Sequence, residues 1–141
     1  KYSGVARVKA ETVIGHGRAD IVLTPMKASL TSAVLELKVT RDFLTPQPGT
    51  VTPTPCSLKE NIEWAMSGVS QTAAYRDDEA LDAAYLCVYD FCAGNHEEIG
   101  KAIEEAAIPY SVLAKRYWIT ASHKEHRANR YPNPPDDVDV V

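Results

Sequence analysis

Three charged residues lie in segments that otherwise have the composition of apolar β-strands. Asp20 lies within residues 18–23, and Glu36 and Lys38 lie within residues 33–39. Burying a charge without a partner is expensive, so charges in such segments indicate either a function or a solvent-exposed edge with surface ion pairs. Strand residues two apart point to the same face, roughly 6.6 Å from each other along the strand. Glu36 and Lys38 are therefore expected to share a face.

These residue types could together cleave a phosphodiester bond. If a β-hairpin brings Asp20 beside Glu36, two carboxylates and the Lys38 ammonium converge. Two carboxylates with few other protein ligands suit Mg²⁺, which keeps several waters and accepts phosphate oxygens. Lys38 could orient or deprotonate an attacking water and stabilise charge in the transition state. A Glu-x-Lys pair alone is common and favours a solvated edge; its combination with Asp20 sixteen positions earlier is far more specific.

The predicted helix over 57–77 carries a second group of polar and aromatic residues. Gln71 and Tyr75 are four apart and share a helix face, and Trp64 lies near the same direction. The opposite face carries an apolar stripe made of Ile62, Met66, Val69 and Ala73. Taken alone, the pattern fits a surface glutamine and an aromatic residue at the margin of the core equally well.

Three segments together resemble the PD-(D/E)XK nuclease superfamily, and its RecB-like branch most closely: residues 17–21 (GRADI), 36–38 (ELK) and 71–75 (QTAAY). The resemblance implies a restriction-endonuclease-like α/β fold, a central mixed sheet flanked by helices. It implies Asp20, Glu36 and the Leu37 carbonyl as ligands of Mg²⁺ or Mn²⁺. It further implies Lys38 as catalytic base or charge stabiliser, Gln71 as a residue organising the site, and Tyr75 as a substrate contact.

Two departures from the family pattern concern the start of the chain and the residue before Asp20. The family usually opens with a helix, which is expected upstream of Lys1, so that the sequence is interpreted as part of a longer protein. Ala19 stands where many members have proline. The cysteine set of the iron–sulfur nucleases in this branch is missing.

The chain is predicted to contain five strands and two helices in the order β-β-β-α-β-α-β. The strands are expected at 5–14, 18–23, 33–39, 83–91 and 111–120, and the helices at 57–77 and from about 95 to before 109. Ser57 and Glu60 form a capping box that starts the first helix. The proline-rich segment 40–55 is predicted to lack regular structure. In the third strand, the residues predicted to face the core are Leu35, Leu37 and Val39.

Further basic residues are candidates for substrate binding. Arg18 shares a strand face with Asp20 and could pair either with that carboxylate or with a phosphate. Arg116, Lys124 and Arg127 belong to a basic C-terminal region that also contains aromatic residues, a composition that can grip phosphates and stacked bases. A solvated basic face is an equal alternative. A short helix is possible over 123–131.

Composition sets the remaining limits. The 141 residues suffice for one domain, expected over 1–131, followed by a disordered Pro/Asp-rich tail over 132–141. The net charge of −4 gives no direct argument for nucleic acid, and metal-binding carboxylates contribute to it. Three cysteines argue against a disulfide framework and favour a reducing, cytoplasmic location. No segment approaches the apolar length of a membrane helix.

The sequence therefore predicts a Mg²⁺- or Mn²⁺-dependent nuclease that acts on DNA rather than RNA. A fused upstream domain or a homodimer is a possible context. Two alternatives stay open: a catalytically silent nucleic-acid-binding or assembly module, and a nuclease toxin with an immunity partner.

Overall fold

The computed structural model describes residues 6–14, 17–44, 48–49 and 51–120. The predicted order of strands and helices is confirmed, with two short strands in addition. The principal elements are β1 (Ala6–Ile14), β2 (Gly17–Pro25), β3 (Ala33–Thr40), α1 (Leu58–Asp78), β6 (Ala83–Asp90), α2 (Glu97–Ala107) and β7 (Leu113–Trp118), with a 3₁₀ turn at Ile108–Tyr110. The predicted short helix at 123–131, the tail at 132–141 and the domain boundary between them lie outside the described residues.

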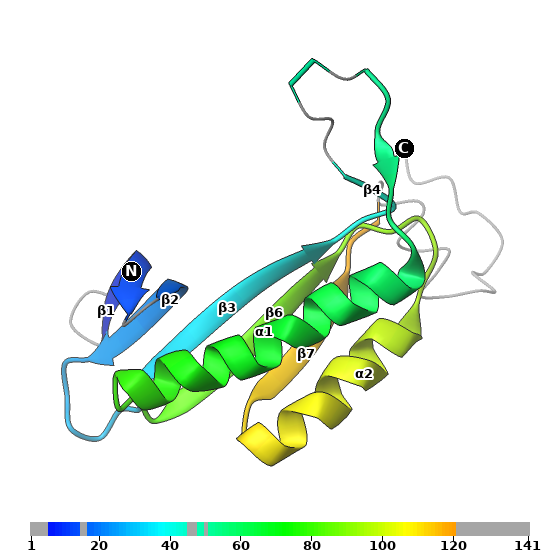
Figure 1. Ribbon diagram of the computed structural model, residues 1–141. Helices are drawn as coiled ribbons and strands as arrows, with labels where there is room; N and C mark the ends of the chain where they lie inside the picture. Colours follow the sequence, from blue (N-terminus) through cyan, green and yellow to red (C-terminus); the bar gives the residue numbers. More distant parts are fainter. Residues whose placement is uncertain (1–5, 15–16, 45–47, 50, 121–141) are drawn as a thin grey trace, which may run out of the picture.

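A five-stranded mixed sheet forms the centre of the fold. Its strand order is β1-β2-β3-β6-β7. The first three strands pair antiparallel, whereas β3, β6 and β7 pair parallel. Each parallel connection passes through a helix, and both α1 and α2 lie on the same face of the sheet (Figure 1). Right-handed crossovers that advance in one direction along a sheet place their helices on one side.

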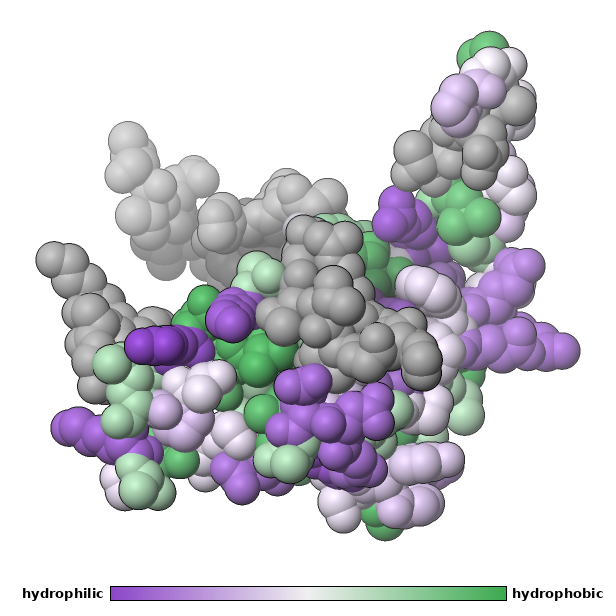
Figure 2. All heavy atoms as spheres, turned by 60° about the vertical axis from the view of Figure 1, so that its left-hand side comes forward, coloured by the Kyte–Doolittle hydropathy of each residue, from purple (hydrophilic) through white to green (hydrophobic). Residues whose placement is uncertain are grey.

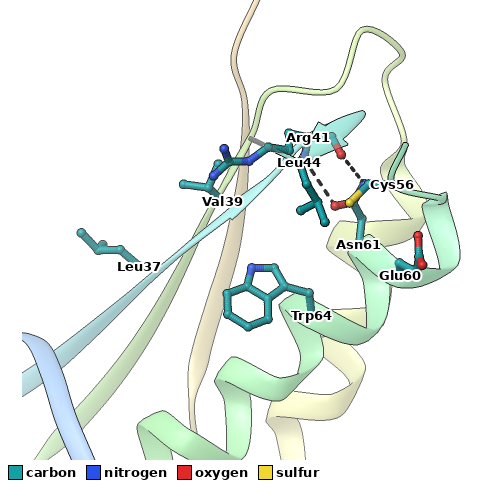
Figure 3. A pocket seen from close by; sticks show the side chains of 8 residues that line it. All are labelled: Leu37, Val39, Arg41, Leu44, Cys56, Glu60, Asn61 and Trp64. Atoms are coloured by element: carbon teal, nitrogen blue, oxygen red, sulfur yellow. Dashed lines mark hydrogen bonds between the residues drawn. The ribbon is translucent and has the colours of Figure 1, made fainter. Parts of the chain in front are cut away.

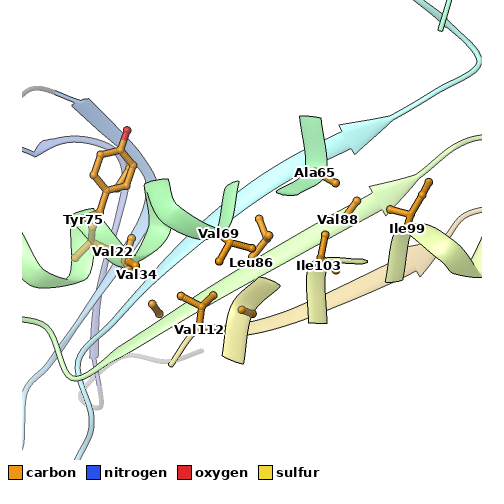
Figure 4. Packing of buried hydrophobic residues seen from close by; sticks show 14 residues of the cluster. Val22, Val34, Ala65, Val69, Tyr75, Leu86, Val88, Ile99, Ile103 and Val112 are labelled. Carbon is orange, nitrogen blue, oxygen red and sulfur yellow. The ribbon is translucent and has the colours of Figure 1, made fainter. Parts of the chain in front are cut away.

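The hydrophobic core lies between this helix layer and the sheet (Figure 4). Leu86 and Val88 of β6 are fully buried, as are Ile99 and Ile103 of α2, and Val69 of α1 is nearly so. Alternation along β6 is regular, with every second residue buried. The buried set faces the helices, which is the period-two pattern of a sheet covered on one side.

The expected orientation of β3 is reversed by the structure. Glu36 and Lys38 lie on the buried face, with 4% and 6% of their surface exposed. Leu35, Leu37 and Val39 lie on the opposite face and are more exposed. Hydrophobicity alone predicted these three residues in the core, and that prediction was wrong, because the charged pair finds partners under α1 that make its burial tolerable.

Helix α1 begins at the predicted capping box. Ser57 accepts a hydrogen bond from the Glu60 backbone, and the Glu60 side chain accepts one from the Ser57 backbone. The face turned to the sheet is built largely from small or polar residues, including Asn61, Ala65, Gly68 and Thr72. Small residues there let the helix approach the strands closely.

Residues 40–55 contain more regular structure than was predicted. β4 (Phe43–Leu44) pairs antiparallel with β5 (Thr54–Pro55), and the Cys56 N–H donates to the Asp42 carbonyl. This short ladder projects from the body near the start of α1 (Figures 1 and 2). Proline is tolerated there because β5 has a partner on only one side. Phe43, Leu44 and Val51 are exposed. Figure 2 shows hydrophobic atoms on the segment that projects from the body.

Among the described residues, no helix has both the length and the apolar character needed to cross a membrane.

Candidate active site

The site forms where β2 separates from β3. The two strands pair only over three residues of β3, from Leu23↔Ala33 to Ile21↔Leu35. Beyond this point the Asp20 side chain replaces the missing strand partner, since its Oδ2 accepts a hydrogen bond of 2.8 Å from the Leu37 N–H. Backbone N–H and C=O groups of one strand residue point to the same edge. The Leu37 carbonyl therefore lies on the same edge of β3 as Asp20.

Glu36 carries a buried carboxylate that is only partly satisfied. Its Oε1 lies 3.6 Å from Lys38 Nζ. Its Oε2 is buried without a hydrogen-bond partner among the described residues. Burial raises the pKa of Glu36, the nearby Asp20 carboxylate raises it further, and Lys38 only partly offsets both effects. Two carboxylates have thus been brought close enough to repel each other.

Lys38 is held by a chain of contacts from α1. Its Nζ donates to Gln71 Oε1 at 3.1 Å, and Gln71 Nε2 donates to the Tyr75 hydroxyl at 2.9 Å. The same Nζ lies 4.0 Å from the ring centroid of Trp64, a cation–π contact. The ammonium is therefore fixed in place, although 7% of the Lys38 side chain remains exposed.

Gly68 sets the distance between α1 and this lysine. A Cβ at Gly68 would come within 3.2 Å of Lys38 Cγ and Cε and within 2.6 Å of Leu86 Cδ1. A glycine in the middle of a helix costs about 1 kcal/mol relative to alanine. Here the missing side chain makes room for the aliphatic part of Lys38, so that its ammonium reaches Gln71 and Trp64.

The donor atoms fit a hard divalent cation. Among the described residues no group of three or more His, Cys, Asp or Glu side chains comes together. The available donors are the carboxylates of Asp20 and Glu36 and the Leu37 carbonyl. Mg²⁺ is commonly bound by one or two carboxylates while it keeps several waters. The unpaired Glu36 Oε2 and the repulsion from Asp20 would both be relieved by a cation between them.

The structure brings together five of the residues singled out from the sequence for their chemistry: Asp20, Glu36, Lys38, Gln71 and Tyr75. Trp64 was noted on the same helix face but given no role. Its contact with Lys38 could have been anticipated from the seven-residue spacing to Gln71, which returns a helix to nearly the same direction.

The predicted substrate-binding residues outside this group have other surroundings. Arg116 lies on the helix-covered face of β7, where its Nε donates to Asp90 Oδ2 at 2.7 Å and its guanidinium also reaches Asn95. Arg116 is therefore not part of the group formed by Asp20 and Glu36. The backbone of Arg18 belongs to β2, opposite Val13. The Arg18 side chain and the whole of Lys124 and Arg127 lie outside the described residues.

Asp90 is a buried residue that the sequence analysis did not single out. It is fully buried and accepts hydrogen bonds from the Thr40 hydroxyl, the Cys92 N–H and Arg116. Burial raises the pKa of Asp90, but these hydrogen bonds outweigh that effect and lower the pKa overall. No local pattern identifies it, because two of its partners, Thr40 and Arg116, come from other strands.

No protein-family model matches the sequence, and no curated protein matches it either.

Proposed function

We propose that this protein is a metal-dependent nuclease of the PD-(D/E)XK superfamily that hydrolyses phosphodiester bonds, with DNA as the favoured substrate. The observation that carries the proposal is the buried Glu36 carboxylate, which lies next to Asp20 and Lys38 and whose Oε2 has no hydrogen-bond partner in the described part of the chain. A fold gains no stability from such a carboxylate pair, so a ligand with positive charge accounts for it.

The residues divide the chemistry among them. Asp20, Glu36 and the Leu37 carbonyl would hold Mg²⁺ or Mn²⁺. When bound, that cation lowers the pKa of a coordinated water and neutralises charge on the phosphate. Lys38, as an ammonium, orients the attacking water and stabilises charge developing on the phosphate oxygens, while the proton of that water leaves to bulk solvent. Gln71 positions Lys38, and Tyr75 fixes the orientation of the Gln71 amide.

The proposal also includes the cellular compartment of the protein. Three cysteines are without disulfide partners in the described part of the chain, which supports a reducing compartment such as the cytoplasm.

Cleavage of a mixed substrate panel tests the function. Supercoiled plasmid, linear duplex, single-stranded DNA and RNA are incubated with Mg²⁺, Mn²⁺ or EDTA. We expect cutting that requires metal and that Glu36→Ala abolishes while the fold is kept. The control is Glu63→Gln, because that side chain is 65% exposed on α1 and pairs with Lys59 rather than with a residue of the site. Metal-independent cutting, or full activity of Glu36→Ala, would contradict the proposal.

Lys38 and Gln71 separate metal binding from turnover. Lys38→Met should lower the cleavage rate by roughly 10²–10³-fold, the usual cost of removing one donor that stabilises charge in the transition state. The rise in melting temperature that Mg²⁺ produces should persist, because the carboxylates remain. Gln71→Ala should give a smaller loss, and Lys59→Met, on the exposed face of α1, should give none. A silent binding module would instead show metal or nucleic-acid binding with no cleavage in any of these proteins.

A further inference from the structure

A cavity of about 540 Å³ opens beside the candidate active site, between the β3 edge and the start of α1 (Figure 3). Leu37, Val39 and Leu44 line it together with Cys56 and Trp64. Its volume falls in the range of small-molecule sites, and its walls are mainly apolar. Leu37 lines this cavity and its backbone N–H donates to Asp20, so the cavity adjoins the site.

Trp64 gives the cavity a flat aromatic wall. The side chain remains 51% exposed although Lys38 already lies over its ring. A half-exposed indole in a cavity offers its remaining surface to another planar ring. Stacking of a nucleobase on an aromatic side chain is favourable for every base, because every base has a π-face.

The β3 backbone adds hydrogen-bonding groups to the same wall. The Leu37 N–H donates to the Asp20 carboxylate. The Arg41 N–H donates to Asn61 Oδ1 at 3.3 Å, and the Arg41 C=O accepts from Asn61 Nδ2 at 2.9 Å. Alternate strand residues point to the same edge, so Val39 presents its N–H and C=O between them. No described strand pairs with β3 there. A nucleobase edge carries donors and acceptors that such a pair can meet.

We propose that this cavity receives one unpaired nucleobase of the substrate, stacked on Trp64, while the adjoining phosphate lies at Asp20, Glu36 and Lys38. The inference rests on the proposed nuclease function and narrows its substrate to nucleic acid with an unpaired base. A base inside a duplex is stacked and paired, so it must be single-stranded, frayed or flipped to enter. A peptide that adds as a further strand fits less well. The Leu37 N–H and the Arg41 N–H and C=O, on either side of Val39, are already hydrogen-bonded to side chains.

The test compares two short oligonucleotides of equal length and charge in EDTA, which leaves them uncut. One is an oligothymidylate, and the other carries abasic spacers in place of every nucleotide. Affinities are measured by fluorescence anisotropy of a 5′ label. We expect the wild-type protein to bind the oligothymidylate roughly five- to 100-fold more tightly, the range that one stacked base contributes. Trp64→Ala should remove this difference, so that the variant binds both strands with equal affinity.

A second variant keeps the test independent of the Lys38 contact. Val39 is 36% exposed on the open face of β3, so Val39→Phe fills the cavity without entering the core. It should also abolish the preference for bases. Equal binding of both strands by the wild type, binding of neither, or a preference unaffected by both variants overturns the inference. Cleavage with Mg²⁺ is scored separately, so a base-dependent preference in an inactive protein would refute only the nuclease proposal.

Discussion

At the scale of single residues, the burial of Glu36 makes the stability of the protein depend on pH. Its pKa is raised above the ordinary value of 4.5 by burial and by Asp20. The folded state therefore favours the protonated carboxyl. Its stabilising contribution is complete below the ordinary pKa and is lost as the pH rises through the raised value. Above the raised pKa the ionised side chain destabilises the metal-free protein, and a bound cation would reverse this effect.

This pH dependence can be measured by thermal melting between pH 4.5 and 8. In EDTA, Glu36→Gln should melt a few degrees above the wild type at neutral pH, and the difference should shrink toward pH 4.5. Mg²⁺ should raise the melting temperature of the wild type but not that of Glu36→Gln. Glu63→Gln, whose carboxylate is largely exposed, should follow the wild type throughout. A wild type more stable than Glu36→Gln in EDTA at neutral pH would assign Glu36 a structural role.

At the scale of elements, the close packing of α1 on β3 decides where Lys38 lies. Side chains of this helix hold the ammonium at Gln71 and Trp64, and Gly68 provides the space for its aliphatic part. Propensity alone would favour alanine at this position by about 1 kcal/mol. The steric contacts at Gly68 oppose that preference.

Gly68→Ala should therefore lower both stability and cleavage. The added Cβ would come within 2.6 Å of Leu86 and within 3.2 Å of the Lys38 side chain, so α1 must shift away from the sheet. A loss of roughly 1–3 kcal/mol, as in other overpacked cores, is expected in urea titrations. Gly100→Ala in α2 is the matched control. Its Cβ would meet Arg116 only at 3.7 Å, so helix propensity should dominate and raise stability slightly.

At the scale of the whole molecule, a buried polar network ties the ends of the three parallel strands together. Thr40 of β3 and Arg116 of β7 both donate to Asp90 of β6. Asp90 is fully buried, and the Arg116 side chain is 10% exposed. The network lies where the strands leave the sheet, so it fixes the position of β3 relative to its neighbours and with it the direction of Lys38.

Arg116→Met should act on stability rather than on substrate binding. The change leaves the Asp90 carboxylate buried without its cation, which typically costs about 3–5 kcal/mol. Urea unfolding measures this loss. Lys115→Met, on the exposed face of the same strand, should change stability by less than about 0.5 kcal/mol. If Arg116→Met keeps full stability but loses affinity for nucleic acid, the residue binds substrate as the sequence suggested.

The sequence by itself determined the order of the elements, the helix start at Ser57 and the shared face of Glu36 and Lys38. These features follow from local periodicity and capping, which need only neighbouring residues. Only the tertiary structure decided that this face is the buried one and that Arg116 pairs with Asp90. Both depend on contacts between strands and helices far apart in the chain. A strand's alternation defines two faces, but the packing of α1 selects which one is covered.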